Sequence, residues 1–303
     1  RKLVDLKKIG QAKLRIAVEL MHGTGRGYLD SLLEEAGTKV IRFNEKLNPL
    51  FGGGSPEPNE AGMAEAADFV RRRKADLALG LDGDADRFGI VDKDGTWLNP
   101  NEILTLTLYH LKKHQDKKGS AVRTVPTSHQ VDAVAKLFNV NIHETPVGFK
   151  HIGALMESEP IIVGGEESGG LSIGNHIPEK DGILACLLMV ELVATEGKPL
   201  GQILKKLEKQ IGRFYTDRIN ITVPPEKKSF ILKRLSRGLN KIGNYPVQSF
   251  IRTDGFKFLL ENDEWVCFRA SGTEPVIRCY LEAKSSSHLR KLKSACRKFL
   301  SLK

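Results

Sequence analysis

Short apolar runs and longer amphipathic stretches alternate along the first third of the chain. This pattern predicts strands at 13–20, 39–43, 76–81 and 88–92 and helices at 25–36 and 60–74. Strands that alternate with helices are typical of an α/β domain with a partly parallel sheet. After an Asp94-Gly95 hairpin signal, we expect this domain to end at Leu98.

The same rhythm continues in the middle of the chain. It predicts strands at 121–125, 139–144 and 160–163 and helices at 99–114, 130–137, 149–157, 182–195 and 199–211. Asn99 suits the N-cap of the first of these helices, and Pro100 suits its first position. A glycine-rich loop runs from the last strand to Asp181. We therefore expect a second mixed-sheet α/β domain over residues 99–212.

The last third of the chain has a different order. It predicts strands at 215–223, 247–251, 256–260, 264–268 and 276–283 and helices at 226–239 and 287–300. Strands in hairpin order with two helices indicate an α+β domain with an antiparallel sheet. The predicted fold class is two mixed-sheet α/β domains (1–98 and 99–212) followed by a C-terminal α+β domain (213–303).

Composition narrows the function classes. The chain is 40% hydrophobic and has a net charge of +10, and its densest basic runs are Arg71–Lys74 and Arg290–Lys298. Both runs fall on helix-like segments without interleaved aromatic residues, so we interpret them as solvated helix faces and expect no nucleic-acid partner. No apolar run reaches the roughly 18 residues of a membrane span, so we expect no membrane association.

The start of the sequence and its cysteines bear on the cellular compartment that we expect for the protein. The start, RKLVDLKKIGQAK, has no signal peptide and reads as the middle of a protein. Four cysteines stand far apart without a CxxC pair: Cys186, Cys267, Cys279 and Cys296. Buried reduced thiols in a cytoplasmic protein are the expected interpretation, with metal binding or a disulfide as the alternative.

The first candidate site is the run Asp82–Arg87, directly after a buried strand. Asp82, Asp84 and Asp86 alternate in a tight turn and can converge on one hard cation. An EF-hand loop would need Gly at its sixth position and Glu at its twelfth, and this chain has Arg87 and Lys93 there. A solvated acidic turn and a phosphatase with an Asp nucleophile stay open as alternatives.

Two further loops offer polar groups beside glycines. In the glycine-rich run 164–170, Glu166 and Ser168 can bind sugar hydroxyls, although a plain turn would look similar. In the run 269–278, Arg269, Arg278, two hydroxyls and free backbone amides suit a phosphate dianion. The latter is not a P-loop, because G-x-x-x-x-G-K-[ST] is absent from the sequence.

Together and in this order, the three loops resemble the α-D-phosphohexomutase superfamily of phosphoglucomutases and phosphomannomutases. The matching stretches are DGDADR (82–87), GEESG (165–169) and RASGTEPVIRCY (269–280). Stretches at 22–29, 145–152 and 174–182 add to the resemblance, which covers essentially the whole chain. We interpret the G-x-G-x-G turn within the first of these, at 23–27, as structural.

The resemblance implies a role for each site residue. Mg²⁺ would be bound by Asp82, Asp84 and Asp86. Arg87 would approach the transferring phosphate, and His176 is a candidate acid or base. A phosphorylated hexose would be held through its hydroxyls by Glu166 and Ser168 and would also contact Lys150 and Lys180. Its unreacting phosphate would be bound by Arg269, Ser271, Gly272, Thr273 and Arg278.

The family also has a first domain whose serine carries the catalytic phosphoryl group. In the family that serine lies in a loop resembling TASHNP, and no such loop exists in this sequence. Thr127-Ser128-His129-Gln130 looks similar but lacks the Asn-Pro, and Ser128 suits a helix N-cap. We therefore expect domains two to four of the family, inactive alone, with the missing N-terminal domain of the same protein as a partner.

The substrate expectation rests on two positions of the glycine-rich loop. Glu167 gives GEESG, as in phosphoglucomutases, and Gly170 stands where phosphoglucosamine mutases have histidine. The resemblance therefore favours exchange between glucose 1-phosphate and glucose 6-phosphate through a phosphoserine and a bisphosphorylated sugar. The alternatives are a phosphomannomutase, a dual-specificity mutase, and a natural non-catalytic sugar-phosphate-binding protein.

Overall fold

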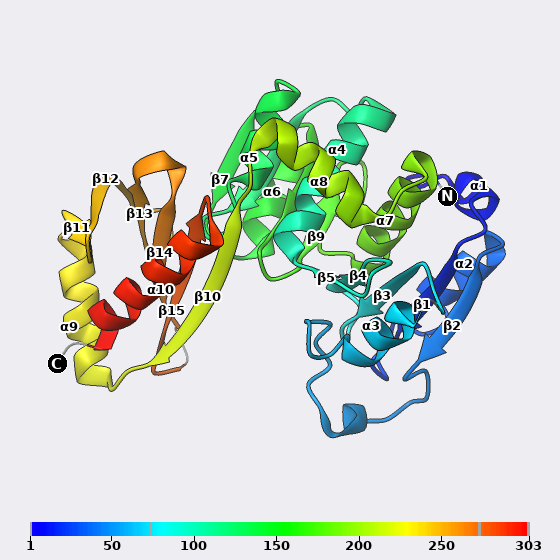
Figure 1. The fold of residues 1–303 in the computed structure, drawn as a ribbon, viewed down its shortest axis with the longest axis horizontal. Helices are drawn as coiled ribbons and strands as arrows, with labels where there is room; N and C mark the ends of the chain where they lie inside the picture. Colours follow the sequence, from blue (N-terminus) through cyan, green and yellow to red (C-terminus); the bar gives the residue numbers. More distant parts are fainter. Residues whose placement is uncertain (1, 73, 272–273, 302–303) are drawn as a thin grey trace. The chain divides into compact units, whose positions relative to one another are not determined.

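A computed structural model describes residues 2–72, 74–271 and 274–301 (Figure 1). It divides into two compact units. The first unit comprises residues 1–123, 131–143 and 148–211, and the second comprises 124–130, 144–147 and 212–303. Each unit has its own hydrophobic core.

The first sheet of the first unit is mixed. Its order is β2-β1-β3-β4-β5, with β1 (Arg15–Glu19), β2 (Lys39–Phe43), β3 (Leu77–Leu81), β4 (Phe88–Val91) and β5 (Trp97–Leu98). The pairs β1/β2 and β1/β3 are parallel, whereas β3/β4 and β4/β5 are antiparallel. Its helical segments are α1 (Leu6–Gln11), α2 (Leu29–Glu35), the short 3₁₀ helix η1 (Phe51–Gly53) and α3 (Ala64–Arg71).

The second sheet has the order β7-β6-β8-β9. Its strands are β6 (Ser120–Thr124), β7 (Ile142–Thr145), β8 (Ile161–Gly165) and β9 (Leu171–Ile173), and its helices are α4 (Pro100–Gln115), α5 (Gln130–Leu137), α6 (Phe149–Ser158), α7 (Gly182–Glu196) and α8 (Leu200–Ile211). β6 and β8 are parallel, and β8 and β9 are antiparallel. At the start of α4, Asn99 is the N-cap and Pro100 is the first residue, as predicted, and Glu102 completes a capping box that was not predicted.

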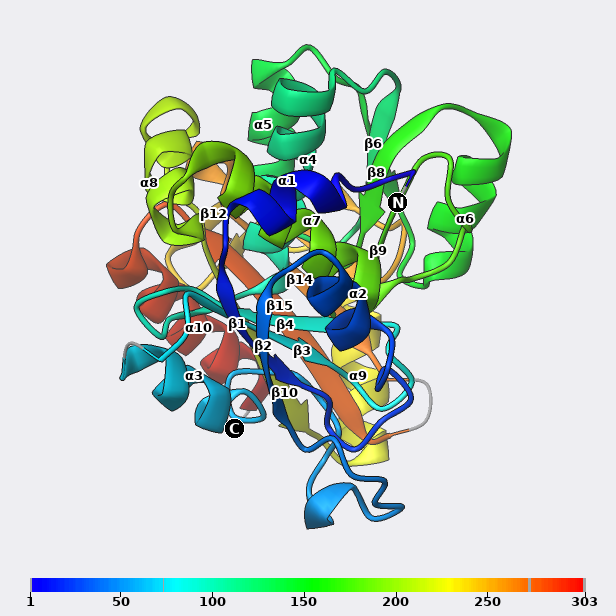
Figure 2. The same ribbon diagram turned by 90° about the vertical axis from the view of Figure 1, so that its right-hand side faces the viewer.

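Helix α7 joins the two sheets of the first unit into one core. Eleven of its fifteen residues are buried, and it contacts α1, α4, β3, β4 and β9 (Figure 2). A helix that is apolar on all sides is stable only when protein surrounds it. No described helix is both long and apolar enough to cross a bilayer.

The second unit is built on one antiparallel sheet of order β10-β15-β14-β13-β12-β11. The strands are β10 (Tyr215–Thr222), β11 (Lys241–Ile242), β12 (Tyr245–Ile251), β13 (Phe256–Leu260), β14 (Trp265–Ala270) and β15 (Val276–Ala283), accompanied by α9 (Pro225–Ser236), η2 (Glu261–Asp263) and α10 (Ser286–Ser301). α10 packs on β10, β11 and β15. The predicted fold class, two mixed sheets followed by an antiparallel one, is confirmed.

A few local predictions were wrong. Helix α1 and strands β9 and β11 were not predicted, because each is too short to show a period. The helix predicted to reach Lys74 ends at Arg71, so Lys74 lies beyond the helix. The four cysteines are buried and free, as predicted, and burial raises the pKa of the Cys267 thiol to about 12.

Candidate functional site

The acidic loop, residues 82–87, is the turn of the β3–β4 hairpin. Leu81 pairs with Phe88, and the Asp82 carboxylate closes the turn by accepting the Arg87 amide at 2.9 Å. Ala85, between two of the aspartates, takes a left-handed conformation with φ 64°. One carboxylate oxygen from each of Asp82, Asp84 and Asp86 lies within 4.8 Å of the others.

This loop has the electrostatics of a cation site. Burial raises the pKa of Asp82 to about 7, and the negative charges of Asp86 and Asp84 add to the rise. A divalent cation would remove the repulsion among three carboxylates, and all-oxygen ligands suit Mg²⁺. The donor set therefore fits a hard divalent cation.

The turn at 23–27 packs against the acidic loop and supports it. Thr24 donates its amide to the Gly83 carbonyl at 2.9 Å, and Gly83 donates to the Pro56 carbonyl at 3.2 Å. A Cβ added at Gly23 would lie 2.7 Å from the Gly83 oxygen, so a side chain would displace the loop. These contacts support the structural interpretation of that turn.

The glycine-rich loop 164–170 lies directly against the acidic loop. Arg87 and Gly170 form an isolated antiparallel bridge, and the Glu166 amide donates to the Gly170 carbonyl at 2.9 Å. Glu166 is buried, and its carboxylate accepts the Gly148 amide at 2.9 Å. Ser168 is exposed at the tip of the loop. The acidic loop and the glycine-rich loop, which are far apart in the sequence, are thus direct neighbours in the structure.

The segment 174–182 completes this arrangement. Lys180 Nζ lies 2.5 Å from Asp86 Oδ2, and the Gly182 amide donates to the Ala85 carbonyl at 3.1 Å. Burial alone would lower the pKa of Lys180, but the hydrogen bond and charge of Asp86 outweigh it, and the pKa is raised. His176 Nε2 lies 2.8 Å from Asp181 Oδ2, which fixes the imidazole ring.

These groups border one cleft of about 480 Å³. Its lining includes Thr24, Tyr28, Asp84, Asp86, His176 and Lys180. The structure therefore brings His176 and Lys180 together with the acidic loop. Lys150 is exposed in the first turn of α6 and does not line this cleft.

The arginine loop, residues 269–278, belongs to the second unit. Arg269 on β14 and Arg278 on β15 are direct cross-strand partners. Like charges placed opposite each other destabilise a sheet, and an anion between them would relieve that cost. Gly272 and Thr273, also predicted to bind phosphate, lie outside the described residues.

Polar partners hold the described part of this loop in shape. The buried Ser271 hydroxyl accepts the Glu274 amide at 3.2 Å. Lys228, from α9, donates to the Ser271 carbonyl at 2.6 Å and to the Glu274 carbonyl at 2.8 Å. Sequence reasoning missed Lys228, because nothing in its neighbourhood marks it off from the other surface lysines of α9. Sequence reasoning also missed Glu57, which pairs with Arg87 at 3.3 Å, because no local pattern distinguishes it from other surface glutamates.

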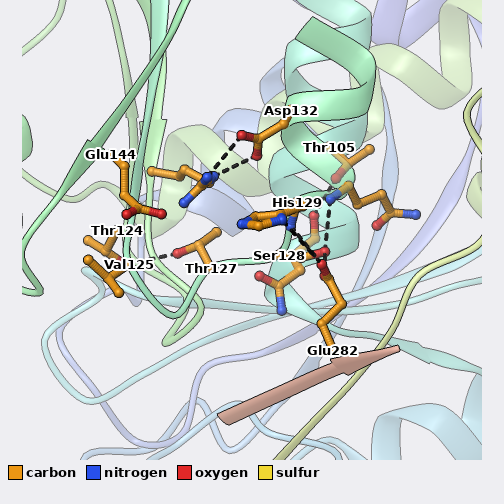
Figure 3. Close-up of polar contacts among 12 residues, drawn as sticks. Thr105, Thr124, Val125, Thr127, Ser128, His129, Asp132, Glu144 and Glu282 are labelled. Carbon is orange, nitrogen blue, oxygen red and sulfur yellow. Dashed lines mark hydrogen bonds and ion pairs between the residues drawn. The ribbon is translucent and has the colours of Figure 1, made fainter. Parts of the chain in front are cut away.

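Ser128 has a structural environment in the second unit. Its hydroxyl is buried, donates to Glu282 and accepts the Gln130 amide at 3.0 Å at the start of α5 (Figure 3). Glu282 also accepts the Trp265 indole N–H at 2.7 Å. The interpretation of Ser128 as a residue that caps a helix start agrees with these contacts.

Comparison with known proteins gives three family models that match in order along the chain. They describe domain II, domain III and the C-terminal domain of phosphoglucomutase/phosphomannomutase, at residues 1–95, 99–211 and 219–298.

Individual proteins match over nearly the whole chain. A phosphoglucomutase/phosphomannomutase of Thermococcus kodakarensis is 31% identical over 95% of this chain and 60% of its own length. A phosphoglucosamine/phosphogalactosamine mutase of Sulfurisphaera tokodaii is 27% identical over 98% of this chain and 64% of its own. A Thermus thermophilus structure described as a phosphomannomutase has a TM-score of 0.84 and 31% identity, covering 98% of this chain and 63% of that one. The chain thus spans between 60% and 64% of the length of these relatives.

Proposed function

The chain belongs to the phosphoglucomutase/phosphomannomutase family, and we propose that it forms the Mg²⁺-binding and substrate-binding part of a phosphohexomutase. The observation that carries this proposal is the cleft in the first unit, where the acidic loop meets Lys180 and His176. We also propose that its functional divisions are a metal-binding domain (1–98), a sugar-binding domain (99–212) and a phosphate-binding domain (213–303).

The proposed reaction exchanges a phosphoryl group between C1 and C6 of a hexose. Mg²⁺ held by Asp82, Asp84 and Asp86 would neutralise negative charge on the phosphoryl oxygens. Arg87 stabilises the transferring group by its positive charge. Phosphoryl transfer depends on positioning and charge neutralisation, so these residues need not form a covalent bond to the sugar.

The other residues orient the sugar. Glu166 accepts hydrogen bonds from hydroxyl groups, and Ser168, exposed at the loop tip, can both donate and accept. Lys180 and Lys150 contribute positive charge, and His176, fixed by Asp181, holds or moves a proton. Arg269, Arg278 and Ser271 bind the phosphate that does not react, with charge-assisted bonds from the two arginines.

No residue of the sequence matches the phosphoserine of the family, so we propose that these 303 residues alone do not turn over substrate. Ser128 cannot substitute, because its hydroxyl is buried against Glu282. Turnover of glucose 1-phosphate by the pure chain that is lost in Ser128→Ala would contradict this proposal. A phosphoserine domain added as a separate protein should restore activity.

Glucose phosphates are the proposed substrates, because of Glu167. The matched relatives bear names with different hexose and hexosamine substrates, so mannose phosphates and dual specificity remain the alternatives. A non-catalytic sugar-phosphate binder is the other class, but a pure binder has no need of the three converging carboxylates.

A titration of the chain with four ligands tests the proposal. Glucose 6-phosphate, mannose 6-phosphate and glucosamine 6-phosphate would be compared with unphosphorylated glucose by calorimetry in the presence of Mg²⁺. We expect glucose 6-phosphate to bind most tightly and glucose not to bind measurably. Binding of no phosphorylated hexose would contradict the substrate part of the proposal.

A further inference from the structure

Asp254 lies beside the arginine loop, in the turn between β12 and β13. Arg269 donates from Nη2 to Asp254 Oδ2 at 2.8 Å. The same oxygen accepts the backbone amide of Val147, also at 2.8 Å. One carboxylate oxygen, itself held by a backbone donor, therefore holds the Arg269 guanidinium, and the Tyr280 side chain is a second hydrogen-bond partner of that guanidinium.

The turn that carries Asp254 is shaped around Arg269. Gly255 has φ +77°, a conformation that favours glycine. A Cβ at Gly255 would lie 2.5 Å from the Phe268 carbonyl oxygen and 2.7 Å from Arg269 Cγ. The turn therefore packs closely on Arg269 and places the carboxylate of Asp254 within hydrogen-bond distance of its guanidinium.

Arg269 is a side chain whose freedom matters for binding. Arg269 is the direct cross-strand partner of Arg278, and its Nε is buried with no hydrogen-bond partner among the described residues. A free arginine loses rotamer entropy when it grips an anion, and an arginine that is already held loses less. Asp254 thus restricts the Arg269 side chain before a phosphate binds, which lowers the entropy that the side chain loses on binding.

We propose that Asp254 is a positioning residue for phosphate binding: it holds the Arg269 guanidinium in the orientation that receives the ligand's phosphate. This inference rests on the proposed function, since it takes a hexose phosphate as the ligand of Arg269. Asp254 itself does not contact the ligand.

Two effects of opposite sign act on the affinity. The Asp254 carboxylate repels a phosphate dianion, but its charge is already paired with Arg269 at 2.8 Å. Without Asp254, the guanidinium would keep only its weaker neighbour Tyr280, and the ligand would have to supply the rest of the order. Positioning therefore outweighs repulsion, and removing the carboxylate weakens binding.

A double-mutant cycle with the 303-residue chain and glucose 6-phosphate tests the inference. Asp254→Ala should weaken binding about tenfold, the loss expected for one charge-assisted hydrogen bond. Asp254→Asn keeps an acceptor for Val147 but loses the charge, and should weaken binding about threefold. In an Arg269→Ala background, Asp254→Ala should have no further effect. Unchanged or tighter binding by Asp254→Ala, or full additivity in the double variant, would overturn the inference.

A second readout needs no ligand. The ¹⁵N–¹H signal of Arg269 Nε, assigned by its loss in Arg269→Ala, should show an ordered side chain in the wild-type chain and a mobile one in Asp254→Ala. Arg290 on α10 is the control, and its signal should not change. An Arg269 signal that is equally ordered in both proteins would overturn the inference.

The two readouts separate the inference from the function on which it rests. A wild-type chain that binds no hexose phosphate contradicts the proposed function, and the guanidinium signal still decides the role of Asp254. A wild-type chain that binds glucose 6-phosphate through Arg269, with no loss in Asp254→Ala, contradicts the inference alone. Equal thermal unfolding of all variants would show that each is folded.

Discussion

The acidic loop and the arginine loop are both turns between antiparallel strands, yet they collect opposite charges. The β3–β4 turn gathers three carboxylates, and the strands that flank the β14–β15 turn place two arginines opposite each other. The surrounding sequence follows the same division: residues 1–211 have 28 Lys and Arg against 29 Asp and Glu, whereas residues 212–303 have 19 against 8. The net positive charge of the chain therefore resides in its C-terminal part.

This comparison shows that like charges can be held together in two ways. In the acidic loop, the turn itself brings the aspartates together, and burial raises the pKa of Asp82. In the arginine loop, sheet register places Arg269 opposite Arg278, and carboxylates of Asp254 and Glu274 pair with them. The acidic loop keeps an excess of negative charge beside its basic partners Lys180 and Arg87 and fits a cation. In the arginine loop each arginine has one carboxylate partner, and Lys228 adds a further positive charge that suits an anion.

The largest expected effect is a loss of Mg²⁺ affinity when an aspartate of the acidic loop is replaced. Asp84→Asn should weaken Mg²⁺ binding by about tenfold to a hundredfold, because a charged ligand is lost from a set of three. Wild-type binding should itself be weak, since the family's phosphoserine ligand is not in this sequence. Calorimetry would measure both proteins, and Asp94→Asn, in the nearby β4–β5 turn, is a matched control. Equal Mg²⁺ binding by Asp84→Asn and the wild type would contradict the assignment of the acidic loop as the metal site.

The second effect tests the arginine loop. Arg269→Ala should weaken glucose 6-phosphate binding about tenfold or more, because a charge-assisted bond to the phosphate is lost. Arg290→Ala removes the same charge from an exposed position on α10 and should change the affinity little. Neither substitution should alter Mg²⁺ binding. If Arg290→Ala weakened glucose 6-phosphate binding as much as Arg269→Ala, general positive charge rather than this loop would bind the phosphate.

A smaller effect is expected at the base of the same loop. Lys228→Ala removes the two hydrogen bonds to the carbonyls of Ser271 and Glu274 and should weaken glucose 6-phosphate binding about fivefold. Lys227→Ala, at the exposed neighbouring position, should have no such effect. Titration of both variants would measure the difference. Equal affinities for the two variants would show that Lys228 does not shape the loop.

The smallest effect concerns pH and the first unit. Burial would raise the pKa of Glu196, but Lys113, His114 and Tyr109 outweigh it and lower the pKa to about 2. Because the folded pKa is lowered, Glu196 contributes stability above pH 4.5 that is lost as the pH falls toward 2. Glu196→Gln should therefore cost about 1 kcal/mol at pH 7 and less at pH 3.

The two tryptophans allow the unfolding of each unit to be followed separately, since Trp97 lies in the first unit and Trp265 in the second. Urea unfolding followed by fluorescence in Trp265→Phe would report the first unit, and in Trp97→Phe the second. We expect only the first transition to respond to Glu196→Gln. A loss of stability that stayed the same from pH 7 to pH 3 would contradict the assignment of this carboxylate.

Most of the elements were predictable because the signals that specify them are local. The apolar periods predicted β2, α5, β13 and β15 with the bounds that the structure shows, and Asn99 marked the start of α4. Short elements such as β9, with three residues inside a glycine-rich stretch, have no period to read. The predicted ends of the helices α3 and α9 differed from the observed ends by a few residues, because the apolar period does not mark where a helix stops.

The sequence by itself predicted the three candidate ligand loops, because each proposed set of ligand groups is a contiguous stretch whose spacing carries its chemistry. Only the tertiary structure decided which groups support them. Lys180 reaches Asp86, Lys228 reaches Ser271 across 43 positions, and Asp254 reaches Val147 across 107. Such contacts arise from strand order and packing, and a surface lysine or a turn aspartate has no local pattern that reveals its partner.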